Sequence, residues 1–308
     1  MLHGSSQFAI CPHGHPAPNF KRDAAEWYNT VSVMFDASYS YVEQSLAAGN
    51  ANTSIVASLL QNLDDNDNQP EEEVIIREAF GAAYSAGVDT TYSSINIFIL
   101  AMLKFPDVQR KAQQELDRIV GLGRLPDFED RGSLPYITAV LRETLCWVPI
   151  APLAAPHRLT VNNVYEGFHF PAGSLFIGNA WAILHDETRY PNPEAFVPER
   201  FPTPEGELDS NAPDPREACF GYGKRMCPER HFALESVWIA IASLLAVYNI
   251  EKAVDELGRV VEPSGEYISG ALWYVTRISE SSCSVVSYPL PFDASFKPRH
   301  VNATALIQ

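Results

Sequence analysis

The sequence has few basic residues, few cysteines and no long apolar run, and each shortage excludes a class of protein. Its 22 Lys and Arg stand against 38 Asp and Glu, a formal net charge of −16, which repels phosphate backbones and argues against a nucleic-acid partner. The five cysteines are scattered and odd in number, a usage typical of a reducing compartment rather than of a disulfide framework.

Membrane and export signals are also missing. The most apolar stretch, residues 237–247, is too short to cross a bilayer and predicts a buried helix. The first residues have neither the basic start nor the apolar run of a signal peptide. We therefore expect nothing in this chain to anchor it in a membrane.

What the sequence does have is enough apolar content for a sizeable core. Of its 308 residues, 46% are hydrophobic and 19% are charged, which excludes wholesale disorder. The length suits one large domain or two ordinary ones. There are no internal repeats.

Apolar periodicity, helix-start signals and proline positions predict a mainly helical chain with a minor β-sheet. The predicted helices cover residues 21–48, 71–103, 107–120 and 133–147, with a last helix from just after Cys227 to about Tyr248. Predicted strands cover residues 164–170 and 174–180, and the tail from residue 267. Residues 1–19 are predicted to be a loose start, and residues 189–215, rich in proline, an irregular ordered loop.

The run FGYGKRMCPERHFA, residues 220–233, contains the first candidate site. Cys227 stands at the mouth of a predicted helix, where helix-start amides and the nearby Arg225 favour a thiolate. Gly221 and Gly223 let the backbone approach a large flat group. A buried structural cysteine is the alternative, but the glycines and Arg225 at fixed offsets favour a ligand-binding loop.

The run AGVDTT, residues 86–91, lies in the middle of the longest predicted helix. Gly87 and Thr90 share a helical face, and Thr90 is able to bond back to a preceding carbonyl and open the helix locally. With Asp89 alongside, this opening would bind a small ligand and relay protons. A simple helix-packing contact explains the motif equally well.

Together these motifs resemble the haem-thiolate monooxygenases of the cytochrome P450 family, most closely the fungal members. Two further runs support the resemblance: AVLRETLCW at residues 139–147 is similar to the E-x-x-R helix, and FVPERF at residues 196–201 is similar to the loop that sets an arginine against that helix. The resemblance implies that residues 1–308 form the C-terminal portion of a cytochrome P450 fold.

The resemblance also implies a b-type haem and a set of site residues. Cys227 would be the axial ligand of the haem iron, and the other cofactor-binding residues would be Arg225, Phe220, Gly221, Gly223, His157 and Arg158. Thr90 and Asp89 would deliver protons, Ala86 and Gly87 would border the substrate pocket, and Glu143 and Arg200 would form a structural cluster.

The implied reaction inserts one atom of O2 into a small organic substrate of secondary metabolism. Its electrons would come from NADPH through a flavoprotein reductase. The protein is expected to be a monomer. Family members are anchored in the endoplasmic-reticulum membrane, and without an anchor this chain is expected to be cytosolic or peripheral to that membrane.

Four features depart from the family and leave a rival interpretation open. Cys146 replaces the arginine of E-x-x-R, so that Glu143 is expected to have Arg200 alone as its partner, and Glu229 replaces a glycine of the haem loop. Residues 271–284 look like an insertion, and the chain is expected to lack the family's N-terminal portion. The rival is a non-catalytic relic with impaired haem binding.

A third interpretation is a metal-binding module built on the run CPHGH, residues 11–15. The run is short and lacks a second pair of ligands. It therefore carries little weight beside the four family motifs.

Overall fold

The computed structural model describes residues 20–50, 54–63, 69–268 and 286–307. The chain divides into two compact units, residues 1–86 and 87–308. The boundary falls inside the long helix α3 (Gln69–Lys104). The runs at residues 1–19 and 271–284, for which a loose start and an insertion are predicted, lie outside the described residues.

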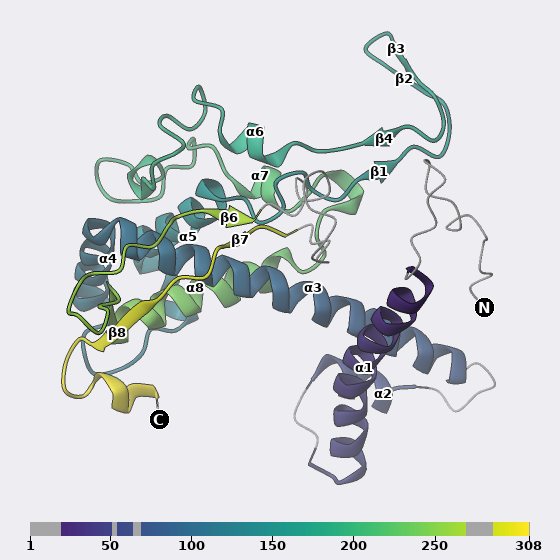
Figure 1. The fold of residues 1–308 in the computed structure, drawn as a ribbon, viewed down its shortest axis with the longest axis horizontal. Helices are drawn as coiled ribbons and strands as arrows, with labels where there is room; N and C mark the ends of the chain where they lie inside the picture. Colours follow the sequence, from purple (N-terminus) through teal and green to yellow (C-terminus); the bar gives the residue numbers. More distant parts are fainter. Residues whose placement is uncertain (1–19, 51–53, 64–68, 269–285, 308) are drawn as a thin grey trace. The chain divides into compact units, whose positions relative to one another are not determined.

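The first unit contains α1 (Phe20–Ala47), α2 (Ile55–Gln61) and the beginning of α3 (Figure 1). The helix α2 begins at an N-cap, because the hydroxyl of Ser54 accepts a hydrogen bond from the amide of Ala57 at 3.1 Å. The sequence did not lead us to predict α2. A guanidinium–carboxylate pair between Arg77 and Asp36, 3.7 Å apart, links α3 to α1.

The second unit is built around four helices. These are the end of α3, α4 (Pro106–Ile119), α5 (Pro135–Trp147) and α8 (Arg230–Val247). Shorter helical segments connect them: η2 (Phe128–Ser133), α6 (Ala180–Leu184), η3 (Pro198–Arg200), α7 (Arg216–Cys219), η4 (Gly223–Arg225) and η6 (Ala303–Ile307). The apolar faces of the four main helices form one core.

Among the described residues, four pairs of short antiparallel strands complete the unit. The pairs are β1 (His157–Arg158) with β4 (Leu175–Phe176), β2 (Asn163–Tyr165) with β3 (Phe168–Phe170), β5 (Tyr248–Lys252) with β8 (Ala294–Pro298), and β6 (Tyr267–Ile268) with β7 (Tyr288–Pro289). The prediction of a mainly helical chain with a minor β-sheet is confirmed, and so are the main helices to within three residues at each end.

The predicted single strand over residues 164–170 is wrong. The chain turns at Glu166 and Gly167, whose φ angles are 49° and 82°, so that β2 and β3 form a hairpin. Two successive positive φ angles are what a tight two-residue hairpin requires. Figure 1 shows this hairpin standing out from the helices of its unit.

The predicted strand over residues 174–180 is also wrong beyond Phe176. The side chain of Asn179 accepts a hydrogen bond from the amide of Ala182 at 3.0 Å and so caps α6. This cap turns the last residue of the predicted strand, Ala180, into the start of a helix.

The helix α5 lies at the centre of the second unit. From Tyr136 to Trp147 every residue except Arg142 is buried. One face joins the main core through Ile137, Val140 and Leu145. The other face packs into a second apolar cluster, whose members are Ala139, Cys146, Ala180, Leu184, Tyr190, Phe201 and Ala218.

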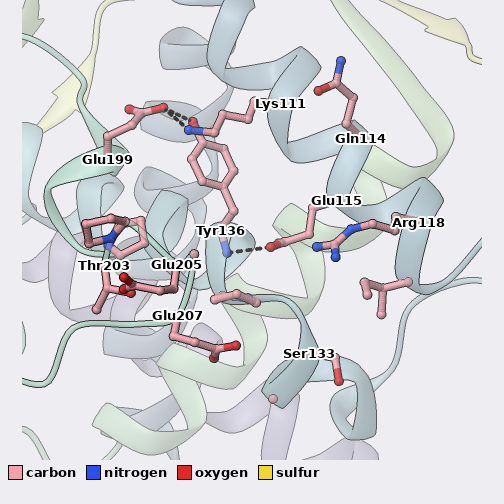
Figure 2. Close-up of a pocket in the computed structure, with 16 residues that line it drawn as sticks. Lys111, Gln114, Glu115, Arg118, Ser133, Tyr136, Glu199, Thr203, Glu205 and Glu207 are labelled. Carbon is pink, nitrogen blue, oxygen red and sulfur yellow. Dashed lines mark hydrogen bonds and ion pairs between the residues drawn. The ribbon is translucent and has the colours of Figure 1, made fainter.

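A carboxylate from α4 caps the N-terminus of α5. The N-cap residue Leu134 offers no side-chain acceptor. Instead, the two carboxylate oxygens of Glu115 accept from the amides of Tyr136 and Ile137, each at 3.0 Å. Figure 2 shows the bond from Tyr136. A negative charge at the positive end of the helix dipole is favourable, although burial raises the pKa of the Glu115 carboxyl.

Two helices, residues 70–104 of α3 and residues 230–247 of α8, are long and apolar enough to cross a membrane by length and composition alone. The core helices of soluble proteins pass the same test, and both helices contribute side chains to the main core. Our expectation for α8 considered only its apolar run of 11 residues, whereas the whole helix has 18.

We expect Glu115→Ala to lower the free energy of unfolding by about 1–2 kcal/mol, because two buried amides of α5 lose their acceptor. Urea unfolding followed by far-UV circular dichroism measures this change. The neighbouring exposed residue provides the control, and Gln114→Ala should change the free energy by less than about 0.5 kcal/mol. Equal effects of the two substitutions would show that the cap contributes nothing.

Candidate functional site

The loop that carries Cys227 folds back on itself ahead of α8. The amide of Cys227 donates to the carbonyl oxygen of Phe220 at 2.8 Å. Gly221 and Gly223 adopt φ angles of 79° and 58°, which a residue with a Cβ adopts only at a cost. The glycines therefore allow the tight turn that holds Cys227, and this cysteine lies half-buried.

Two residues separate Cys227 from α8, which begins at Arg230 rather than directly after the cysteine. Glu229 occupies the N-cap position, but its side chain makes no capping hydrogen bond. The Arg230 guanidinium donates instead to the carbonyl oxygen of Cys227 at 3.1 Å. The cysteine thus stands just ahead of the positive end of α8, as the sequence predicts.

The second motif lies in an unbroken stretch of α3. Asp89 is exposed and Thr90 is half-buried. The carbonyl oxygen of Thr90 accepts from the hydroxyl of Ser94 at 2.7 Å. The chain is helical throughout the motif, and the hydroxyl of Ser94 adds a bond there. The local opening at Thr90 stays a prediction.

Glu229 brings the two motifs together. A Cβ placed on Gly87 of α3 would lie 3.3 Å from the Oε2 atom of Glu229. The Glu229 side chain therefore reaches from the loop that carries Cys227 to the glycine of α3. Residues about 140 positions apart in the sequence meet at one site.

The predicted Glu143–Arg200 cluster is present and almost completely buried, with 1% and 9% of the two side chains exposed. The guanidinium donates from Nε to Oε2 at 2.9 Å and from Nη2 to Oε1 at 3.2 Å. Its Nη1 donates to the carbonyl oxygen of Pro191 at 2.7 Å. This two-pronged contact fixes α5 against η3.

Our expectation that Glu143 has Arg200 alone as its partner is wrong. The amide of Val197 donates to Oε1 of Glu143 at 2.8 Å, so that both carboxylate oxygens are bonded. Burial raises the pKa of the Glu143 carboxyl, and its contacts with Arg200 and Val197 oppose that rise. Every residue except proline has a backbone amide, so the sequence motif gave no indication that the amide of Val197 would bind Glu143.

Cys146 is not a gap in the cluster. Its thiol lies 3.5 Å from the carbonyl oxygen of Leu184, as a weak donor, and the residue is 3% exposed within the second apolar cluster. Burial, and then the charge of Glu143, raise the pKa of the thiol to about 12. Position 146 therefore makes a neutral apolar contact, whereas the family motif has a positively charged arginine there.

His157 and Arg158 lie on β1, and both are exposed. In the part of the chain that the structure describes, no hydrogen bond or ion pair joins them to Cys227. The segment that follows β4 approaches the cysteine loop, because the ring of Tyr222 packs on Gly178, where a Cβ would overlap it. An isolated glycine at a strand end is the sequence signal for such a close approach.

A separate cleft of about 1070 Å³ lies between α4, the start of α5 and residues 199–207. Figure 2 shows Lys111 and Tyr136 both reaching the carboxylate of Glu199, at 2.9 and 2.7 Å. The polar groups that line the cleft nearest α5 are thus occupied in structural contacts. None of the lining residues belongs to the Cys227 loop or to α3.

A family model described as "Cytochrome P450" matches residues 16–263. The chain is 42% identical to cytochrome P450 monooxygenase 98 of Postia placenta over 96% of the chain and 55% of that protein. It is 38% identical to tryptamine 4-monooxygenase of Psilocybe cyanescens over 94% of the chain and 54% of that protein. The chain spans about half the length of these relatives.

We expect the Glu143–Arg200 pair to contribute far more to stability than an exposed ion pair does. Removing one partner, in Glu143→Ala or Arg200→Ala, leaves a buried charge and should cost about 3–5 kcal/mol. The double variant should lose less unfolding free energy than the two single variants lose in sum. Urea unfolding gives all three values.

The exposed pair Lys297–Glu251, 2.6 Å apart on β8 and β5, provides the control for this cycle. Either single substitution there should cost less than about 1 kcal/mol. If substitutions in the buried pair lower the free energy of unfolding no more than substitutions in this exposed pair, the cluster does not hold the second unit together.

The structure also predicts different reactivities for two thiols. In a chain with Cys11, Cys219 and Cys283 changed to serine, iodoacetamide should modify Cys227 at least about tenfold faster than Cys146, because a buried thiol with a raised pKa forms little thiolate. Peptide mass spectrometry locates the label. Equal rates in the folded chain would contradict the burial of Cys146.

Proposed function

The chain belongs to the cytochrome P450 family, and we propose that it forms the haem-thiolate portion of a monooxygenase. The reaction would insert one oxygen atom from O2 into a small organic substrate, with electrons from NADPH delivered by a flavoprotein reductase. The observation that carries this proposal is the meeting of the Cys227 loop with the Gly87 face of α3.

The residues of the loop fit a b-type haem in their chemistry. Cys227 offers a half-buried thiol, and Gly221 and Gly223 ahead of it, both with left-handed backbone, present no side chain at their own positions. Arg225 is exposed and carries a cation suited to a haem carboxylate. Glu229 is the residue whose side chain reaches into the space between the loop and α3.

In this proposal Cys227 holds the iron as a thiolate, and the bound haem supplies oxygen activation, which a thiolate ligand favours. Phe220, Gly221 and Gly223 shape the loop around the ligand. Arg225 binds a haem carboxylate. His157 and Arg158, both exposed on β1, would bind the other carboxylate.

The residues of α3 would handle protons and substrate. The exposed carboxylate of Asp89 would exchange protons with water. The hydroxyl of the half-buried Thr90 would pass a proton on to the reaction site. Ala86 and Gly87 would border the substrate pocket. Gly87 has no side chain on that face of the helix, and the Glu229 carboxylate lies over it.

The structural part of the proposal assigns Glu143 and Arg200 to positioning. They tie α5 to η3, whose last residue is Arg200. The second apolar cluster then connects α5 to α7, whose last residue directly precedes Phe220. We propose that the chain acts as a monomer and is cytosolic or peripheral to the endoplasmic-reticulum membrane.

A second candidate function is a haem-binding or haem-free relic without turnover. The side chain of Glu229 between the two motifs favours it. A thiolate-type absorbance of the ferrous–CO complex, with product formation in the presence of NADPH and a reductase, would exclude it. Such an absorbance without turnover would support it.

We expect Cys227→Ser to abolish any thiolate-type ferrous–CO absorbance, because the serine hydroxyl cannot replace the thiolate ligand. Cys219→Ser provides the matched control, since Cys219 lies on α7 just ahead of the same loop, and it should keep the absorbance. Retention of the thiolate-type signal in Cys227→Ser would overturn the assignment.

A further inference from the structure

The position of Glu229 is unusual for a residue at the start of a helix. It is the N-cap residue of α8, where a side chain ordinarily accepts a bond from an amide of the first turn, yet its carboxylate makes no such bond. Its Oε2 instead lies 3.3 Å from the place that a Cβ on Gly87 would occupy. The side chain thus crosses from the Cys227 loop to α3.

That crossing leaves no space for a flat ring between the carboxylate and α3. Carbon atoms in contact lie about 3.5–4.0 Å apart, so a planar group between two surfaces needs roughly 7–8 Å between their atoms. Oε2 lies 3.3 Å from the position that a Cβ on Gly87 would occupy. Because a Cβ stands about 1.5 Å from its Cα, Oε2 lies at most about 4.8 Å from the Cα of Gly87, well short of this spacing. A ring bound to Cys227 and covered by α3 therefore requires another rotamer of Glu229.

We propose that the Glu229 side chain is a barrier to haem entry, which the haem must displace from Gly87 before the Cys227 thiolate reaches the iron. The inference rests on the proposed function and deepens it by adding a residue that controls cofactor loading. Displacement costs free energy, because the carboxylate must either turn to solvent or lie against an apolar ring. Haem affinity and the rate of haem association are both lowered by this cost.

The geometry makes the barrier steric in origin. The amide side chain of glutamine has nearly the shape of the glutamate side chain and should obstruct the same space. Glycine removes the obstruction and is itself acceptable at an N-cap. The helix α8 should therefore fold in Glu229→Gly, which separates an effect on haem from an effect on folding.

The experiment titrates haemin into the wild-type chain, Glu229→Gly and Glu229→Gln, and follows the Soret absorbance and the ferrous–CO spectrum. Glu229→Gly should bind haem about tenfold or more tightly than the wild type, and Glu229→Gln should stay close to the wild type. Circular dichroism and urea midpoints check that the variants fold alike. Equal affinities of wild type and Glu229→Gly, or glutamine matching glycine, would overturn the steric barrier.

A double-substitution cycle with Gly87→Ala tests the contact itself. The added Cβ would press on the Glu229 carboxylate, so that the effect of Gly87→Ala on haem affinity should differ between the wild type and Glu229→Gly. Additive effects of the two substitutions would contradict the contact.

The same titration distinguishes two outcomes: the barrier is absent, or the proposed function itself is wrong. If none of the variants gives a thiolate-type spectrum, or if that spectrum survives in Cys227→Ser, the proposed function fails. If the wild type binds haem through Cys227 as tightly as Glu229→Gly does, the proposed function stands and the barrier is absent.

Discussion

The ion pair between Glu143 and Arg200 is the contact on which the arrangement of the second unit depends. It joins the buried helix α5 to η3, with the amide of Val197 as a third donor. Taking two charges out of water costs several kcal/mol each, and only complete pairing offsets this cost. The pair therefore tolerates one geometry, and its value lies in fixing the position of α5 more than in adding net stability.

That fixed position is transmitted to the cysteine loop through apolar packing. Cys146, one turn along α5 from Glu143, packs with Phe201 and Ala218 in the second cluster. Ala218 belongs to α7, which ends at Cys219 and leads directly into the loop of Cys227. Replacing a cation by a small thiol at position 146 thus leaves the connection intact, because an apolar contact takes the place of a charged one.

Glu229 shows how one substitution alters a site whose other parts are in place. The loop glycines adopt left-handed backbone, the thiol is half-buried and α3 is continuous through its motif. Glu229 stands at a position where the family motif has glycine, and its side chain is long enough to reach Gly87 of α3. In our proposal, the conformation of this one side chain governs how readily the site accepts haem, while the fold around it stays the same.

The sequence by itself determined the main helices, because their apolar periodicity and their prolines are local signals. It also supplied the candidate site residues, since the four motifs keep fixed offsets, and the roles of these residues stay proposals. The sequence did not determine the pairing of the strands. Residues 164–170 form a hairpin because Glu166 and Gly167 both adopt positive φ. Of these two residues, only Gly167 is a turn signal.

Only the tertiary structure decided where each motif side chain finds its partners. The amide of Val197, the carbonyl of Leu184 and the face of Gly87 come from segments far away in the sequence. Backbone groups and empty glycine faces carry no residue-type signature. Their meeting with Glu143, Cys146 and Glu229 is set by how helices pack, and that depends on the whole core rather than on any local run.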